Sequence, residues 1–111
     1  MKAVVFPEPG RLEIREVPDP KPAPDEVVLE VKASGICATD IHIFLGEFIA
    51  TYPVIPGHEF SGEVVEVGRE VRRFKVGDRV AVDPCIYCHS CPACRSHEEN
   101  FCHNLKAYGI H

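Results

Sequence analysis

Positive charge and long apolar runs are both scarce in this sequence. Its 12 lysine and arginine residues are outnumbered by 17 aspartate and glutamate residues, which gives a formal net charge of −5 at pH 7. Nucleic acids and anionic membranes attract a basic face, so this balance argues against both as main partners. No stretch approaches the roughly 20 apolar residues of a membrane span, and the apolar run in "MKAVVFPEPG" is too short for a signal peptide. We therefore expect a cytoplasmic protein with reduced thiols.

Internal repeats, low-complexity tracts and long helical apolar periods are also absent. Hydrophobic residues make up 45% of the sequence and charged residues 26%, which is the balance of a folded globular protein. A chain of 111 residues has room for one small domain with a modest core. We expect residues 1–111 to form that single domain.

Short runs of β-branched and other apolar residues, separated by turn residues, predict strands. "PEPG" separates the first two runs. The four prolines of "PDPKPAPDE" exclude a helix and predict an extended connection. The strand candidates are residues 2–6, 12–17, 26–36, 60–68 and 78–82. This pattern is typical of a mainly β, barrel-like domain.

Four cysteines lie within fifteen residues, in "CHSCPACRSHEENFC" (88–102), with the spacing C-x2-C-x2-C-x7-C. Disulfides fit poorly, because the first three thiols can form at most one short bridge among themselves. An iron–sulfur cluster uses the same initial spacing, but it expects the fourth cysteine after three residues, followed by proline. A tetrahedral zinc site tolerates the longer loop before Cys102. The spacing therefore favours zinc. Cys85, three residues before the set, could substitute for Cys88, but we expect it to lie outside the site.

Zinc held by four thiolates has no open position for substrate or water. Such a site stabilises a loop that cannot build its own core, here a lobe at about residues 85–103. Any chemistry must then be carried out elsewhere in the chain.

Two other stretches contain possible metal ligands and proton-transfer groups. They are Cys37, Thr39, Asp40 and His42 in "SGICATDIHIF" (34–44), and His58 and Glu59 in "PGHEFSG" (56–62). Taken singly, each has an ordinary explanation, such as a buried thiol, a loop histidine or a solvated charge. Taken together, they supply a thiolate, an imidazole and a carboxylate for a zinc that keeps an exchangeable position. Asp40 is the kind of group that holds the second ring nitrogen of a ligand histidine.

The motifs "GICATDIH", "PGHEFSGEVVEVG" and "FKVGDRV" precede the four-cysteine lobe in that order. Over essentially all of its residues, the sequence thereby resembles the zinc-dependent alcohol dehydrogenases of the medium-chain dehydrogenase/reductase family. The resemblance is to their GroES-like N-terminal domain. The wording of "GICATDIH" and "GHEFSG" is most similar to that of the polyol and threonine dehydrogenase branch. The resemblance implies a mainly β fold: a GroES-like distorted β-barrel with short helices and a four-cysteine zinc lobe.

The resemblance also implies a role for each motif residue. Cys88, Cys91, Cys94 and Cys102 correspond to structural-zinc ligands, and Cys37 and His58 to catalytic-zinc ligands. Glu59 corresponds to the acidic neighbour that ligates zinc in some members, and Asp40 to the carboxylate that orients the histidine. Thr39 corresponds to the hydroxyl that receives the substrate's proton, and His42 to the histidine that passes it to solvent. Ala38 departs from the family pattern: many members have glycine or arginine there, and the arginine contacts cofactor phosphate.

The activity implied by the resemblance is oxidation of a small-molecule alcohol, with hydride transfer to NAD or NADP in a homo-oligomeric enzyme. Dinucleotide binding in this family uses a βαβ domain with a G-x-G-x-x-G motif, and the sequence contains no such motif. We therefore expect an incomplete N-terminal catalytic domain, inactive without the dinucleotide-binding domain. The alternative is a free-standing, non-catalytic zinc-binding module. A non-zinc reductase of the same fold would need neither the lobe nor the Cys37 and His58 pair.

Overall fold

The computed structural model describes residues 1–111, and its strands form three small antiparallel sheets. The first sheet pairs β1 (Lys2–Val5) with β2 (Glu13–Glu16), and the second places β4 (Phe60–Val67) between β3 (Val27–Ser34) and β5 (Arg79–Ala81). The third pairs β6 (Cys85–Ile86) with β7 (Lys106–Ala107). The helices are α1 (Ala38–Leu45), α2 (Pro92–Arg95) and the 3₁₀-helix Glu99–Phe101. The mainly β prediction with short helices is confirmed, and no helix has the length and apolar character needed to cross a membrane.

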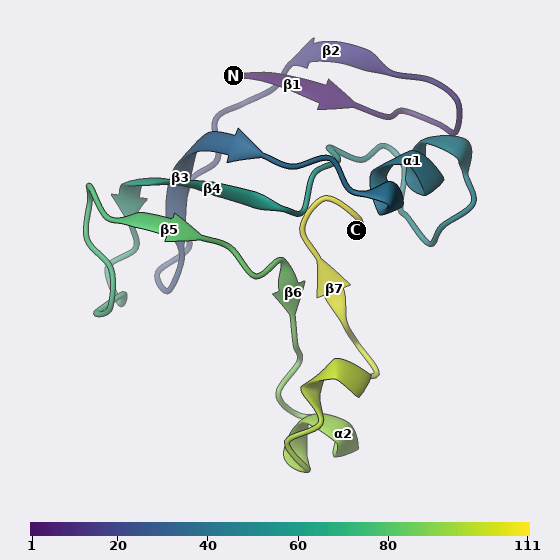
Figure 1. The fold of residues 1–111 in the computed structure, drawn as a ribbon. Helices are drawn as coiled ribbons and strands as arrows, with labels where there is room; N and C mark the ends of the chain where they lie inside the picture. The colour runs from purple at the N-terminus through teal and green to yellow at the C-terminus, as the bar shows by residue number, and fades with distance from the viewer.

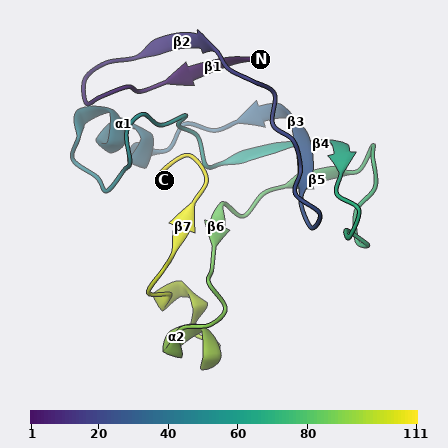
Figure 2. The ribbon, with the colours of Figure 1, turned by 180° about the vertical axis from the view of Figure 1, so that it is seen from behind.

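The molecule has a body and a projecting lobe (Figures 1 and 2). The β1–β2 hairpin lies along one side of the β3–β4–β5 sheet, and α1 lies at the end of the body. The β6–β7 pair leaves the body and carries α2 at its tip, which is the four-cysteine lobe. All five strand candidates form strands. Each observed strand lies within its predicted range, and its ends differ from the predicted ends by at most two residues.

The apolar core of the body is small. Phe6, Ile43 and Val54 are buried together, and the rings of Phe6 and Phe44 meet edge to face with centroids 5.3 Å apart. Phe6 and Val54 exchange two backbone hydrogen bonds of 2.8 and 3.0 Å, which join the first strand to the loop before β4. Ile110, near the C-terminus, packs against the same cluster. The core therefore holds three distant parts of the chain around α1.

Candidate metal centres

The four cysteines of the lobe come together as the spacing predicts. The sulfur atoms of Cys88, Cys91, Cys94 and Cys102 all lie within 4.8 Å of one another. Zinc–sulfur bonds of about 2.3 Å put the sulfurs of a tetrahedral site about 3.8 Å apart. The Cys88 and Cys94 Sγ atoms are 4.0 Å apart, so the donor set fits zinc in number, type and spacing.

Backbone geometry sets these sulfurs in place. Cys91 is the extended residue that precedes α2, and Pro92 occupies the first helical position, where its missing N–H costs nothing. The Cys91 N–H lies 3.4 Å from Cys88 Sγ, and the Cys88 N–H lies 3.4 Å from Cys102 Sγ. Cys102 ends the short 3₁₀-helix. Cys91 and Cys102 thus lie at helix ends, and Cys94 lies within α2.

The thiols of the lobe have opposed acidities. Backbone N–H groups of Ser90 and Cys91 donate to the Cys88 sulfur and lower the pKa of that thiol to about 5. Burial raises the pKa of the Cys94 thiol to about 12, and the neighbouring thiols of Cys91 and Cys102 act in the same direction. Four adjacent sulfurs cannot all ionise without a compensating charge, and a divalent cation supplies that charge. The electrostatics of the cluster therefore fit a metal.

Cys85 does not belong to this cluster. Its side chain forms a hydrogen bond with Tyr87 that raises the pKa of the tyrosine hydroxyl, and its N–H donates to Asp83 Oδ1 (3.0 Å). The four sulfurs gathered in the lobe are those of the C-x2-C-x2-C-x7-C set.

The second cluster joins two segments of the body. One ligand atom each from Cys37, His58 and Glu59 lies within 4.8 Å of the others. Cys37 precedes α1 and His58 precedes β4, so the site forms where these two elements meet. Glu59 is exposed, whereas the thiol and the imidazole are partly buried. Three ligands of different type, one of them open to solvent, suit a metal that exchanges its remaining position.

Asp40 connects the two segments. It is buried, its Oδ2 accepts the Cys37 N–H (2.9 Å), and its Oδ1 accepts the Gly57 N–H (3.2 Å). Nδ1 of His58 lies 3.5 Å from Asp40 Oδ1 and is a buried nitrogen without a hydrogen-bond partner. A buried polar atom without a partner is costly, so the arrangement favours an imidazole whose ring is held by Asp40 on one side and by a metal on the other.

The two candidate proton carriers lie on α1. Thr39 Oγ1 is 3.6 Å from Cys37 Sγ, so the hydroxyl is adjacent to the three-ligand cluster. His42 follows one turn later on the same helix, and its Nδ1 lies 3.0 Å from Glu47 Oε2. Gly46, with φ of 76°, ends the helix in the left-handed conformation that glycine adopts without cost, and this turn brings Glu47 back toward His42. Sequence reasoning did not identify Glu47.

Gly35 lies directly against the Glu59 side chain, where only a residue without a Cβ fits unless that side chain moves. A Cβ at position 35 would lie 2.8 Å from Glu59 Oε2 and 3.3 Å from Glu59 Cβ, and the Gly35 N–H donates to the Glu59 carbonyl (2.7 Å). Sequence reasoning also missed this residue, although a glycine two positions before a candidate ligand cysteine is a possible signal of close backbone approach.

We expect Gly35→Ala to displace the Glu59 carboxylate while leaving the backbone in place. If Glu59 ligates the metal directly, zinc affinity at the Cys37 cluster should fall by about tenfold or more, because one ligand is lost. Competition with a chromogenic chelator would measure this change, and Glu59→Gln is the matched variant. Unchanged affinity in both variants would contradict direct ligation by Glu59.

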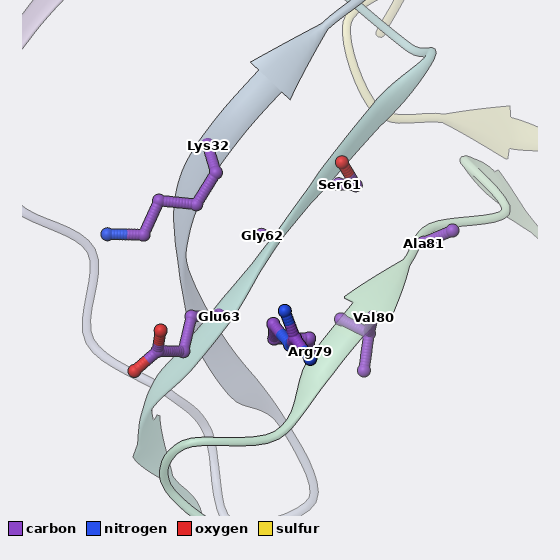
Figure 3. Close-up of a pocket in the computed structure, with 7 residues that line it drawn as sticks. All are labelled: Lys32, Ser61, Gly62, Glu63, Arg79, Val80 and Ala81. Atoms are coloured by element: carbon purple, nitrogen blue, oxygen red, sulfur yellow. The ribbon is translucent and has the colours of Figure 1, made fainter.

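Two of the surface pockets lie on or beside the β3–β4–β5 sheet. A pocket of about 590 Å³ is lined by His58 and Glu59, together with Gly35, Ala33 and Pro84 among others. A smaller pocket of about 340 Å³ lies on the β3–β4–β5 sheet, where Lys32, Glu63 and Arg79 surround it (Figure 3). The smaller pocket contains none of the candidate ligands, whereas His58 and Glu59 line the larger one.

The comparisons with known proteins agree with this geometry. Residues 23–110 match the alcohol dehydrogenase GroES-like domain. The chain belongs to this family. This confirms the resemblance that the sequence motifs carry. D-altritol 5-dehydrogenase of Agrobacterium fabrum is 45% identical over 111 residues, which cover 99% of this chain and 33% of that protein. L-threonine 3-dehydrogenase of Pyrococcus horikoshii is 43% identical over 115 residues, with 99% and 33% covered.

A solved structure shares the fold as well. A protein of Sinorhizobium meliloti 1021, described as a zinc-binding dehydrogenase and bound to NADP, superposes with a TM-score of 0.96 at 47% identity. The match covers 99% of this GroES-like chain and 32% of that one. The chain spans about a third of the length of the relatives it matches.

Proposed function

We propose that this GroES-like domain supplies the zinc-binding and alcohol-binding part of the active site in a zinc-dependent, NAD(P)-linked dehydrogenase. The single observation that carries the proposal is the Cys37, His58 and Glu59 cluster at the edge of a pocket of about 590 Å³. A pocket of this size is within the range of small-molecule sites. The polyol and threonine dehydrogenases among the relatives support a hydroxyl-bearing small molecule as substrate.

Cys37, His58 and Glu59 would hold the catalytic zinc, which when bound acts as a Lewis acid on the substrate hydroxyl. Asp40 fixes the positions of the ligands, because it accepts hydrogen bonds from the backbone on both sides of the site. The Thr39 hydroxyl, beside Cys37, is placed to accept the substrate's proton while passing on its own. The His42 imidazole, with its Nδ1 3.0 Å from Glu47 Oε2, would pass that proton on to solvent.

The four lobe cysteines would hold a second, structural zinc, since four thiolates complete its coordination. The nicotinamide cofactor, NAD or NADP, would be bound by a dinucleotide-binding domain. The relatives are about three times as long as this chain, which is long enough to include such a domain. We place the enzyme in the cytoplasm, where its six thiols would stay reduced. The acidic net charge supports no role for nucleic acid, and homo-oligomer formation stays a prediction.

Titration with Co²⁺ tests this function, because cobalt replaces zinc and absorbs visible light. We expect two equivalents to bind, and Cys37→Ser to abolish one of them and retain the other. Addition of a polyol such as sorbitol should shift the absorption of the Cys37-dependent cobalt. Cys85→Ser, outside both clusters, is the matched control and should bind both equivalents. A second site that is absent, or that no alcohol perturbs, would instead support the non-catalytic module.

A further inference from the structure

The segment that leaves the lobe returns to the candidate catalytic site. After Cys102 the chain forms β7, and the Tyr108 N–H donates to the Pro84 carbonyl (3.1 Å) at the base of the lobe. Ile110 then packs against the apolar cluster of the body, and its carbonyl accepts the Thr51 N–H (3.2 Å). The C-terminal end therefore lies back against the body, as Figure 1 shows.

Between these two anchors, Gly109 contacts Gly57 backbone to backbone. A Cβ at position 109 would lie 2.2 Å from the Gly57 carbonyl oxygen and 2.7 Å from its carbon. Both glycines have positive φ, 77° at Gly109 and 102° at Gly57. Side chains can turn away from a collision, but here the nearest atoms belong to the main chain, so any residue other than glycine must displace the Gly57 peptide.

Gly57 immediately precedes His58 and is held from two sides. Its N–H donates to Asp40 Oδ1 (3.2 Å), while its carbonyl faces Gly109. The Gly57 carbonyl belongs to the peptide bond that leads into His58, so movement of this unit reorients the imidazole that belongs to the three-ligand cluster.

We propose that Gly109 is a positioning residue for His58, so that the strand returning from the lobe sets the geometry of the Cys37, His58 and Glu59 metal site. This inference rests on the proposed function, because it assumes that the cluster binds metal. The proposal gives the lobe a second role. Through β7, the lobe positions Gly109 against Gly57, the residue before His58. Gly109 lies beyond the last lobe ligand, Cys102, so a change at this position leaves the four-cysteine set intact.

The test compares Gly109→Ala with Gly10→Ala. Gly10 has φ of 75°, nearly that of Gly109, but a Cβ there would meet nothing within 4 Å. The control therefore carries the same backbone strain without the collision. Co²⁺ affinity at the Cys37-dependent site is measured by competition with a chelator, and zinc in the lobe is measured in parallel. We expect Gly109→Ala to lower the Co²⁺ affinity of the Cys37-dependent site by about tenfold or more, as loss of groups that orient metal ligands does. Gly10→Ala should leave this affinity unchanged.

Equal affinities in the two variants would overturn the proposal, and so would loss of lobe zinc in Gly109→Ala, since the effect would then be one on the whole fold. Failure of the proposed function appears differently: the unsubstituted protein itself would bind no metal at the Cys37 cluster.

If Gly109→Ala does not fold, a chain ending at Ala107 removes the contact without a collision. Its control is Ile110→Ala, which loses the core packing of Ile110 but keeps Gly109. The truncation should weaken Co²⁺ binding at the Cys37 site more than Ile110→Ala does. Equal weakening would overturn the proposal.

Discussion

Replacing Cys91 by serine is expected to empty the lobe of zinc and to cause the largest loss of stability of any single substitution in the chain. Cys91 is buried, its N–H contacts Cys88 Sγ, and it precedes α2, so serine removes a ligand at the centre of the cluster. A metal bound only by the folded state contributes about 4 kcal/mol when its free concentration is about 1,000 times Kd. We expect a loss of that order, measured by urea unfolding with zinc content determined on the same samples.

The control is Cys85→Ser, which changes a thiol at the start of the lobe that contacts Tyr87 instead of the cluster. It should keep its zinc and most of its stability. A Cys91 variant with unchanged zinc content would contradict the assignment of the lobe, as would a brown iron chromophore in the unsubstituted protein.

The two metal sites should also differ in how they lose metal. After brief treatment with a mild chelator, a thiol reagent followed by mass mapping should modify Cys37 fully while the lobe cysteines remain mostly unmodified. Cys37 is partly buried, and it would share its metal with the exposed Glu59 carboxylate, which lines an open pocket. In the lobe, four thiolates would saturate the metal, and Cys91, Cys94 and Cys102 are at most 9% exposed.

Cys85 provides the internal reference for this experiment, because it is a half-buried thiol without a metal ligand role. Its modification rate should be the same before and after chelation, whereas that of Cys37 should rise. Lobe cysteines that react as fast as Cys37 would show that the distinction between a closed site and an open site is wrong.

The strands of the body were predictable because each is a short stretch that contains β-branched residues and has glycine or proline close to at least one end. The two strands of the lobe were not, since β6 and β7 have two residues each, too few for an alternating pattern to show. Helix α1 was also not located from its pattern. Its eight residues carry only a short apolar stripe, and the helix depends on Asp40 binding the Cys37 N–H and on Gly46 ending it.

The candidate ligands were predictable for a different reason: cysteine spacing and family motifs are local in sequence. The groups that position them are not. Glu47 beside His42, Gly35 beneath Glu59 and Gly109 against Gly57 are identified only when distant segments are seen in contact. No alternation or spacing encodes those contacts, because they depend on how the lobe and the loop before β4 meet.

Burial in this molecule is sparse, and this affects how its stability changes with temperature. Only 12 of its 111 residues are buried, and one of its two buried clusters consists of Cys91, Cys94 and Cys102. The heat capacity change of unfolding scales with the apolar surface exposed, and is about 1.5 kcal/mol/K for an ordinary domain of this length. With so few buried residues we expect a smaller value, and therefore a shallow stability curve on which cold would weaken the fold little. If the lobe binds zinc as proposed, the melting temperature would depend more on the chemical potential of zinc than on hydrophobic hydration.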